Sequence, residues 1–370
     1  MTPKRLSGAG AFPKAVDTPA PNTSDPGQLY AALDLGTNSC RMLIAKPKGN
    51  QFTVVDSFSK SVQLGAGLEA TGQLSRVSIR RTLQALRICK KKLQIHNVKN
   101  MRLVATEACR RAKNSAEFHQ LVRQETGLAL EIIQPEEEAR LAVVSCAPLV
   151  SVRTEQLLVV DIGGGSTELV WIDISKVPDR ERPSSIMRLH KGFQQDHSFE
   201  NNAQVVDWIS VPLGVATLRD LFDDVENDSA RFALMSCHFE ENLTGFLPFQ
   251  SEQAKEAFQI VGTSGTVTTV AASHLGLKRY DRNKVDGLQM TSGQIDVVVR
   301  DYLALGPEGR RADPRIGRDR QALIMSGAAI LQALLRVWPT DQLSVADRGL
   351  REGLLYAQMS ADGVLEGEVF

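Results

Sequence analysis

DLGTNSCRMLIA at residues 34–45 and DIGGGSTELVWI at residues 161–172 are two versions of one pattern. Each begins with an aspartate at the end of an apolar run, continues through a turn rich in glycine and hydroxyl side chains, and ends in a second apolar run. Such a pattern predicts a strand, a tight turn and a second strand. Two loops of this kind that face each other across a cleft could bind a phosphate group from both sides.

Both turns carry groups that bind an anion. Glycines let the backbone approach an anion closely, and successive N–H groups form an anion-binding concavity. Thr37, Asn38 and Ser39 add side-chain donors to the first loop, and Ser166 and Thr167 add them to the second. A hairpin turn that merely contains glycine explains either loop alone equally well, but it explains the matched pair poorly.

Three acids belong to these loops, namely Asp34, Asp161 and Glu168. Carboxylates are hard oxygen ligands, and Mg²⁺ is usually held by one or two of them together with substrate phosphates and water. The sequence therefore predicts a phosphate site that uses Mg²⁺ or Mn²⁺. A third glycine turn, VGTSGT at residues 261–266, opens a predicted helix, whose N-terminus could bind an anion beside Gly265.

A run of three glutamates, Glu136, Glu137 and Glu138, begins another predicted helix, with Pro135 at its first position. Acids at a helix start stabilise the helix dipole, which is the simplest explanation. Successive helical residues point about 100° apart, so the three cannot share one role. One of them could project into the cleft as a general base for water, and helix geometry does not say which.

Basic residues occur in three further places. In TEACRRA, at residues 106–112, Arg110 and Arg111 could clamp phosphate oxygens, with a solvated surface pair as the equal alternative. Residues 75–92 and 304–320 are rich in Arg and Lys. These two stretches are either solvated surfaces or a track for a polyanion longer than the active site.

Composition limits the remaining classes of function. The 370 residues carry 43 basic and 43 acidic side chains, so no whole-chain field favours nucleic acid or a membrane surface. The five cysteines include no CxxC pair, and the sequence has no GxxxxGK[ST], HExxH or GxSxG pattern. Residues 1–28 lack the apolar core of a signal peptide and are predicted to be a disordered tail, and we expect a cytoplasmic protein.

The order of the predicted elements indicates two α/β domains. Three strands followed by alternating helices and strands favour a mixed sheet, and the pattern restarts at residue 157. We therefore predict a first domain over residues 29–150 and a second over residues 151–370. The polar segment 178–202 is predicted to be an irregular inserted loop.

Six motifs, in their order and spacing, resemble the exopolyphosphatase/guanosine pentaphosphate phosphatase (Ppx/GppA) family of the actin/Hsp70/sugar-kinase superfamily. They are DLGTNSCRMLI, IQPEEEARL, DIGGGSTELV, VPLGVATL, VGTSGTVTT and DRGLREGLL, and the resemblance covers about residues 29–360. It implies two ribonuclease-H-like (actin-like ATPase) domains, each with a mixed β-sheet flanked by helices, with a cleft between them. Family members remove terminal phosphates from inorganic polyphosphate, or the 5′ γ-phosphate from pppGpp, with Mg²⁺ or a similar ion.

The resemblance also assigns roles to residues. The family's catalytic glutamate precedes the Ala-Arg pair of EEAR, which is Glu138 here, and its metal-associated acids fall on Asp161 and Glu168. Combined with the loop chemistry, this adds Asp34 as a metal ligand. The predicted phosphate-binding residues are Gly36, Thr37, Asn38, Ser39, Arg41, Arg110, Gly163, Gly164, Gly165, Ser166, Thr167 and Gly265.

The chain departs from the family pattern in two respects. Many members have Ser-Gly where this chain has Gln134 and Pro135, although the EEAR register is intact. Long members add an HD-type helical domain, whereas this sequence contains no His-Asp dipeptide and resembles a short, two-domain form. Relatives often dimerise, so a homodimer is an expectation of the resemblance.

These observations lead to one functional hypothesis and three rivals. An exopolyphosphatase would hydrolyse terminal phosphates of polyphosphate, with pppGpp as a further substrate, by in-line attack of water activated by Glu138. The rivals are a pppGpp-specific 5′-phosphohydrolase, a non-catalytic (p)ppGpp-binding sensor, and a kinase or ATPase of the same superfamily. The basic stretches tilt the prediction towards polyphosphate.

Overall fold

The chain builds two mixed β-sheets, one from each part of the sequence. The structure is a computed structural model, and it describes residues 28–193, 203–250 and 257–365. In the first sheet the strands lie in the order β3-β2-β1-β4-β5. Their bounds are β1 (Tyr30–Leu35), β2 (Ser39–Lys48), β3 (Gln51–Ser61), β4 (Asn100–Ala105) and β5 (Glu131–Ile132).

The second sheet has the strand order β10-β11-β9-β6-β7-β8. Its strands are β6 (Gln156–Ile162), β7 (Thr167–Asp173), β8 (Gln204–Val211), β9 (Phe258–Thr263), β10 (Gln289–Met290) and β11 (Leu343–Ala346). In both sheets a β-hairpin is followed by a strand that pairs in parallel with the first strand of that hairpin, β4 with β1 and β9 with β6. The sheets are therefore two copies of one arrangement, as the sequence repeat predicts.

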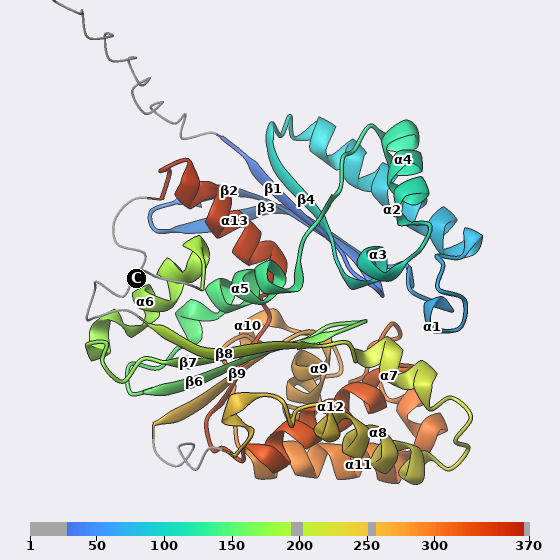
Figure 1. The fold of residues 1–370 in the computed structure, drawn as a ribbon, viewed down its shortest axis with the longest axis vertical. Helices are drawn as coiled ribbons and strands as arrows, with labels where there is room; N and C mark the ends of the chain where they lie inside the picture. The colour runs from blue at the N-terminus through green and yellow to red at the C-terminus, as the bar shows by residue number, and fades with distance from the viewer. Residues whose placement is uncertain (1–27, 194–202, 251–256, 366–370) are drawn as a thin grey trace, which may run out of the picture.

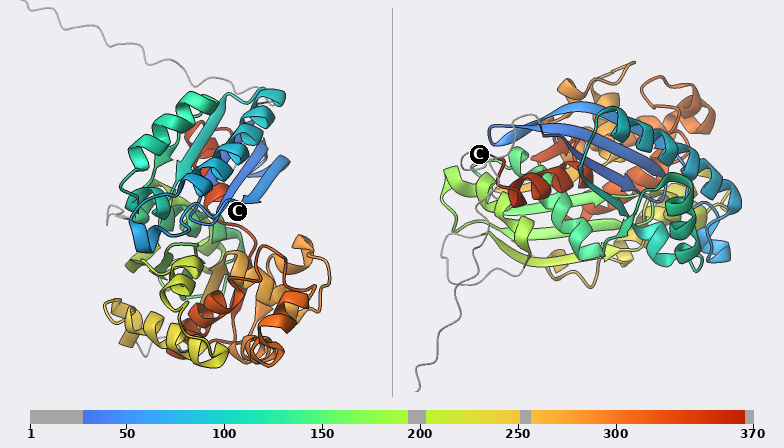
Figure 2. Two further views of the ribbon diagram at one scale, coloured as in Figure 1. Left: turned by 90° about the vertical axis from the view of Figure 1, so that its right-hand side faces the viewer. Right: turned by 90° about the horizontal axis from the view of Figure 1, so that it is seen from above.

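Helices cover both faces of each sheet. Those between β3 and β6 are α1 (Leu68–Thr71), α2 (Arg76–Ile95), α3 (Glu107–Arg111), α4 (Ser115–Thr126) and α5 (Pro135–Cys146). Those that follow are α6 (Arg182–Arg188), α7 (Val215–Leu221), α8 (Asp228–Glu241), α9 (Gly265–His274), α10 (Arg282–Val285), α11 (Ser292–Ala312), α12 (Ile324–Val337) and α13 (Leu350–Ala361). In Figure 1, α5 and α13 lie between the two sheets, and the two halves are also stacked in the left view of Figure 2.

Strand β1 is buried on both faces, which explains its nearly continuous apolar sequence. Ala31 and Leu33 pack in the core formed with α2 and α4. Tyr30 and Ala32 pack on the opposite face with α13. Since side chains alternate along a strand, Asp34 belongs to the α13 face, between the two sheets.

Strand β6 follows the same rule in the second sheet. Leu158 and Val160 pack with α9, α11 and α12 in the largest core cluster. Leu157 and Val159 pack with α5 on the other face. Asp161 falls on the α5 face by alternation. Both sheets therefore direct their loop aspartate into the space between them.

Helix α13 comes from the C-terminal part of the chain but packs on the N-terminal sheet. Leu354 and Met359 belong to the same core cluster as Tyr30 and Leu43. The strands of the first sheet end at residue 132 and those of the second begin at residue 156, while the domain boundary at residue 150 stays a prediction. The last helix thus joins the two halves of the molecule.

Two elements, α6 and β8, were not expected from the sequence. The predicted loop 178–202 contains α6, because Ile186 and Met187 pack against Val143 of α5. Strand β8 was not predicted, since its side chains are mostly half-buried and its sequence, QVVDWISV, alternates poorly. Residues 194–202 of the segment, and residues 1–27 of the predicted disordered tail, lie outside the described residues.

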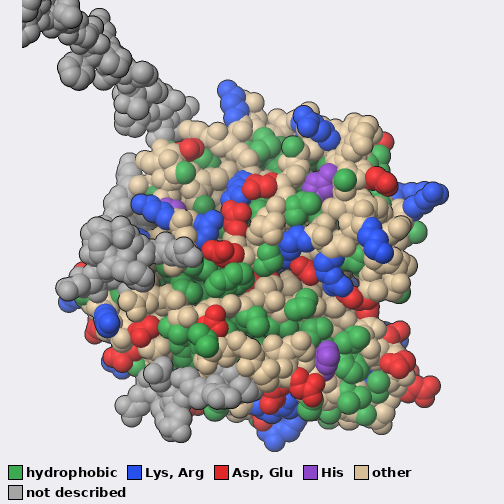
Figure 3. All heavy atoms as spheres, viewed as in Figure 1, with side chains coloured by type: hydrophobic (Ala, Val, Ile, Leu, Met, Phe, Trp, Pro, Cys, Tyr) green, Lys and Arg blue, Asp and Glu red, His purple; other side chains and the backbone are tan. Residues whose placement is uncertain are grey.

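Charged side chains are mixed over the surface. On the face drawn in Figure 3, acidic and basic groups are interspersed. This matches the formal net charge of zero for the whole chain. No helix within the described residues is both long and apolar enough to cross a lipid bilayer.

Candidate active site

The repeated sequence pattern forms two β-hairpins with the same turn. In the first, the N–H of Gly36 donates to the carbonyl oxygen of Ser39 at 2.9 Å. In the second, the N–H of Gly163 donates to the carbonyl oxygen of Ser166, also at 2.9 Å. The two loops are therefore equivalent in backbone structure as well as in sequence.

The hairpins differ in the residue that faces the aspartate across the ladder. Asp34 is paired with Arg41, whereas Asp161 is paired with Glu168. Directly opposed residues of an antiparallel pair project to the same face of the sheet. The first loop therefore combines an acid with a cation, and the second combines two acids.

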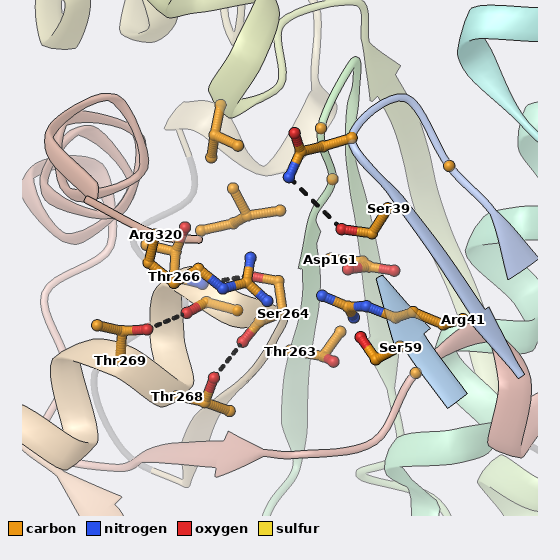
Figure 4. A pocket seen from close by; sticks show the side chains of 18 of the residues that line it. Ser39, Arg41, Ser59, Asp161, Thr263, Ser264, Thr266, Thr268, Thr269 and Arg320 are labelled. Carbon is orange, nitrogen blue, oxygen red and sulfur yellow. Dashed lines mark hydrogen bonds between the residues drawn. The ribbon is translucent and has the colours of Figure 1, made fainter. Parts of the chain in front are cut away.

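Both loops line a cavity of about 470 Å³ between the two sheets. Figure 4 shows part of its lining from close by. Most of the predicted site residues are brought together there: Asp34, Gly36, Thr37, Asn38, Ser39, Arg41, Glu138, Asp161, Gly163, Gly164, Gly165, Ser166 and Gly265. Three predicted residues, Arg110, Thr167 and Glu168, are not among the residues that line the cavity.

The two loops touch each other at one edge of this cavity. A Cβ atom on Gly164 would lie 3.1 Å from the backbone nitrogen of Asn38 and 3.2 Å from Cβ of Thr37. A Cβ atom on Gly165 would lie 2.5 Å from Oγ1 of Thr37. These glycines are needed for the close approach of the two halves. The Thr37 hydroxyl is buried there with no hydrogen-bond partner among the described residues.

Asp34 and Asp161 have few compensating contacts. Neither side chain forms a hydrogen bond or an ion pair with another described residue, and both are largely buried. Burial raises the pKa of both carboxyl groups, and the charges of Glu168 and Asp34 help to raise the pKa of Asp161 to about 7. A bound cation would relieve this cost.

These carboxylates fit a hard divalent ion. Within the described part of the chain, no three His, Cys, Asp or Glu side chains are placed to hold a metal ion by themselves. A site made of one or two carboxylates, substrate oxygens and water is the arrangement typical of Mg²⁺. Asp34 and Asp161 supply such a pair beside the two glycine-rich loops.

Glu168 projects to the same face of the sheet as Asp161, but it is not among the residues that line the cavity. Its carboxylate accepts hydrogen bonds from the hydroxyls of Ser166 at 2.7 Å and Ser210 at 2.8 Å. Burial raises the pKa of Glu168, and the two hydroxyls oppose that shift. Thr167 points the other way and donates to the carbonyl oxygen of Leu213 at 2.8 Å. Both residues hold the loop in shape in this arrangement.

The three adjacent glutamates of α5 have three different surroundings, as helical geometry predicts. Glu136 is exposed, and Glu137 forms ion pairs with Arg102 and Arg140. Glu138 is buried and is the one that faces the cavity. Burial raises the pKa of its carboxyl group well above the usual value, and the charge of Glu168 adds to this rise.

Arg110 is held against Glu138 rather than against the cavity. Its Nη1 donates to Oε2 of Glu138 at 2.8 Å and to the carbonyl oxygen of Ile133 at 2.9 Å. Its Nη2 donates to Glu107 at 2.9 Å. The guanidinium opposes the rise in the pKa of Glu138 and fixes the direction of its carboxylate. A phosphate-binding role for Arg110 stays a prediction.

Arg320 lines the cavity, but its position was not singled out from the sequence. Its guanidinium lies over Gly265, where a Cβ atom would be only 1.9 Å from Cζ of Arg320. Figure 4 places Arg320 and Arg41 in the same cavity, with Asp161 beside Arg41. Burial and the charge of Arg41 lower the pKa of Arg320 to about 10. Neither guanidinium has an ion-pair or hydrogen-bond partner among the described side chains, so the cavity holds two unpaired cations.

The segment after β11 forms another wall. Asp347, Arg348 and Arg351 line the cavity just before and within the first turn of α13. The resemblance to the family included this segment, DRGLREGLL, but assigned it no role. Ser264, the N-cap of α9, has a φ of 115°, which is rare for a residue with a side chain. Such strain is typical of functional sites.

Comparison with known protein families shows to which family this chain belongs. The model of the Ppx/GppA phosphatase family matches residues 43–362. The chain belongs to the Ppx/GppA phosphatase family. The crystal structure of the Aquifex aeolicus member is 30% identical, with a TM-score of 0.69 over 90% of this chain and 98% of that chain. A Cytophaga hutchinsonii exopolyphosphatase structure, 21% identical with a TM-score of 0.75 over 91% and 99% of the two chains, shows the same fold.

Curated relatives carry a more specific name. The guanosine-5′-triphosphate,3′-diphosphate pyrophosphatase of Aeromonas salmonicida is 29% identical over 334 residues, which is 89% of this chain. This chain spans 59% of the length of that relative and of its Aeromonas hydrophila counterpart. The predicted α/β fold, with two mixed β-sheets flanked by helices, is confirmed by the two sheets and by the Ppx/GppA structures.

Proposed function

We propose that this protein is a phosphoric anhydride hydrolase that removes the terminal phosphate of inorganic polyphosphate. One observation carries the proposal: the Glu138 carboxylate lines the same cavity as two anion-binding loops and two unpaired guanidinium groups, those of Arg41 and Arg320. A phosphate-rich anion fills that cavity with compensating charge. Membership of a phosphatase family supports a hydrolytic role for the glutamate.

The residues of the cavity divide the work between binding and proton transfer. Arg41 and Arg320 hold oxygens of the terminal phosphate, and the loop N–H groups support it from both hairpins. Glu138 orients a water molecule for in-line attack on the terminal phosphorus and accepts its proton, while the bridging P–O bond breaks and the shortened polyphosphate leaves with the bond electrons on its terminal oxygen. Arg110 keeps the carboxylate of Glu138 in place. Phosphoryl transfer needs mainly positioning and electrostatic stabilisation, which these groups supply.

Asp34 and Asp161 would hold the divalent ion, Mg²⁺ or Mn²⁺, beside the phosphate. When bound, such an ion neutralises charge on the phosphate oxygens. Glu168 also stays a predicted ligand, although its Oε1 already accepts hydrogen bonds from Ser166 and Ser210. We infer that its main contribution is to hold Ser166 in the binding conformation.

The proposal is tested by replacing the base. Removing a general base typically costs 10²–10⁴-fold in rate, so we expect Glu138→Gln to lose roughly that much in kcat while polyphosphate still binds. Glu136→Gln is the matched control, since this exposed glutamate lies two residues away on the same helix. A folded Glu138→Gln protein with near-normal phosphate release would refute the assignment.

A second candidate is a pppGpp 5′-phosphohydrolase, which is favoured by the name of the Aeromonas relatives. Phosphate release should therefore be compared on polyphosphate, pppGpp and ATP in parallel, with and without Mg²⁺. A higher kcat/KM for pppGpp supports this candidate. A strong preference for ATP points to a kinase or ATPase, and tight (p)ppGpp binding without phosphate release points to a sensor.

A further inference from the structure

A second cavity, of about 330 Å³, lies between α7, α8 and the segment that joins α11 to α12. Five arginines line it, and Asp228 is the one acidic residue among its described lining residues. The arginines are Arg219, Arg231, Arg310, Arg311 and Arg318. This second cavity is therefore strongly cationic, although the whole chain has no net charge.

Three of the five arginines are held by the protein. Arg310 is buried and forms two hydrogen bonds with the Asp228 carboxylate, at 2.7 and 2.8 Å. Arg219 is paired with the adjacent Asp220. Arg231 donates to backbone carbonyls, which leaves its charge without a carboxylate partner. These contacts fix the walls of the second cavity and leave it with excess positive charge.

The other two arginines are free to bind a ligand. Arg311 and Arg318 are exposed, and neither side chain forms a hydrogen bond or an ion pair with any described residue. Arg318 lines both the second cavity and the catalytic cavity, which makes the two cavities neighbours. An anion that extends from one to the other would pass this side chain.

The other basic stretch, residues 75–92, lies away from the catalytic cavity. On α2, Arg87 is paired with Glu125, and Lys92 is paired with Asp56. No residue of α2 is among those that line the catalytic cavity. Of the two basic stretches, only residues 304–320 thus reach the cavity where hydrolysis is proposed.

We propose that the second cavity is a binding subsite for internal phosphates of a linear polyphosphate chain whose terminal phosphate lies in the catalytic cavity. The proposal rests on the proposed function for the identity of the catalytic cavity. A guanidinium matches phosphate oxygens in a planar, bidentate fashion. A chain of regularly spaced phosphates can engage several arginines at once, whereas a compact phosphate ion fills only one position.

Chain length is the variable that tests the subsite. Phosphate release by the full-length protein with Mg²⁺ is measured on tripolyphosphate, on long polyphosphate and on pppGpp. Arg311→Gln removes one free cation that lines the second cavity alone. Arg300→Gln is the control, because this exposed arginine lies on the same helix and lines neither cavity.

Arg311→Gln should affect the hydrolysis of long chains and largely spare that of short ones. Arg311→Gln raises the KM for long polyphosphate by roughly three- to tenfold, since exposed charged contacts contribute modestly one at a time. The effect shrinks as salt is added. The kinetic constants for tripolyphosphate change less than twofold. Arg300→Gln leaves the kinetic constants for both long polyphosphate and tripolyphosphate unchanged. Equal changes for long and short chains, or none, would overturn the subsite.

Two further outcomes distinguish a polyphosphate subsite from a nucleotide subsite and from failure of the proposed function. If Arg311→Gln weakens pppGpp hydrolysis and spares long polyphosphate, the second cavity takes the 3′-diphosphate of the nucleotide, and the proposal is wrong. If the wild type releases no phosphate at all, the proposed function fails, and direct binding decides the subsite. Long polyphosphate should then bind roughly three- to tenfold more weakly to Arg311→Gln than to the wild type, and equal binding would reject the subsite.

Discussion

At the scale of single residues, the cavity holds charged side chains of both signs whose burial is not offset by hydrogen bonds or ion pairs with other described residues. Asp34, Asp161, Arg41 and Arg320 all line the cavity, with Arg41 opposite Asp34 in the first hairpin and beside Asp161. The pKa shifts of all four groups have burial as their largest cause. The protein is therefore under electrostatic strain that substrate and cation would release, at some cost to stability in their absence.

Asp161→Asn should separate stability from activity. The pKa of Asp161 is raised to about 7, so between about pH 4 and 7 the folded state binds a proton that the unfolded state has lost. Its contribution to stability therefore falls as pH rises through this window. At pH 8 in EDTA, we expect the free energy of unfolding of Asp161→Asn to be about 2 kcal/mol higher than that of the wild type. Phosphate release should be lost.

Urea unfolding at pH 5 and pH 8 measures this effect. The gain should be smaller at pH 5, where the wild-type carboxyl group is already protonated in the folded state. Asp301→Asn, on the exposed side of α11, is the control and should change little at either pH. A less stable Asp161→Asn protein at pH 8 contradicts the strain argument.

Arg110 should set the acidic limb of the pH–rate profile. Its positive charge opposes the rise in the pKa of Glu138, so its loss raises that pKa further. Because the proposed general base works in its ionised form, Arg110→Gln should move the acidic limb of kcat/KM to higher pH. Arg111→Gln, whose guanidinium pairs with Glu69, should leave the limb in place. A raised KM with an unmoved limb would instead support Arg110 as a phosphate ligand.

At the scale of elements, the local features were predictable and the long-range contacts were not. The two hairpins and the start of α5 at Pro135 follow from short sequence patterns. Arg320 lies over Gly265 through a contact between segments 55 residues apart, which no local pattern reports. Thr167 turns towards Leu213, just beyond a strand, β8, that the sequence did not reveal.

Helices α5 and α13 meet at a contact that only glycine permits. A Cβ atom on Gly353 would lie 2.1 Å from the carbonyl oxygen of Leu141. Alanine is the better helix former by about 1 kcal/mol, but here overpacking dominates. We expect Gly353→Ala to lower the free energy of unfolding by about 1–3 kcal/mol. Because α5 carries Glu138 and α13 follows Arg348, activity should fall as well.

A Gly→Ala substitution in a helix should instead raise the free energy of unfolding where the added Cβ has free space. Gly293 lies in the first turn of α11, and the nearest atom to its added Cβ is 3.8 Å away. Gly293→Ala should therefore stabilise the protein by up to about 1 kcal/mol. Thermal unfolding of both variants is the measurement, and equal shifts in Tm would show that close packing does not decide the result.

At the scale of the whole molecule, the two halves meet where the loops touch. The first half contributes Thr37 and Glu107, and the second contributes Gly164 and Gly165. The sequence predicted two loops facing each other across a cleft, but it could not predict that they would be in contact. That contact depends on the packing of both sheets around α5 and α13, which is a property of the complete fold.

Gly165→Ala tests whether this contact belongs to the working state of the enzyme. Its Cβ atom would lie 2.5 Å from Oγ1 of Thr37 and 2.9 Å from Cγ of Glu107, so it would push the halves apart. We expect phosphate release to fall at least tenfold, because misplacing reacting groups by about 1 Å can cost about 10²-fold. The free energy of unfolding should change by only about 1 kcal/mol, since the clash lies at the edge of the two cores.

The control is Gly245→Ala, a glycine whose added Cβ meets no atom within 4 Å. It should leave both phosphate release and unfolding near the wild-type values. If Gly165→Ala acts by separating the halves, its KM rises as its kcat falls, because the two loops are proposed to bind the same phosphate. Full activity in Gly165→Ala would mean that the enzyme works with its loops apart, and that the contact between Thr37 and Gly165 forms outside the catalytic cycle.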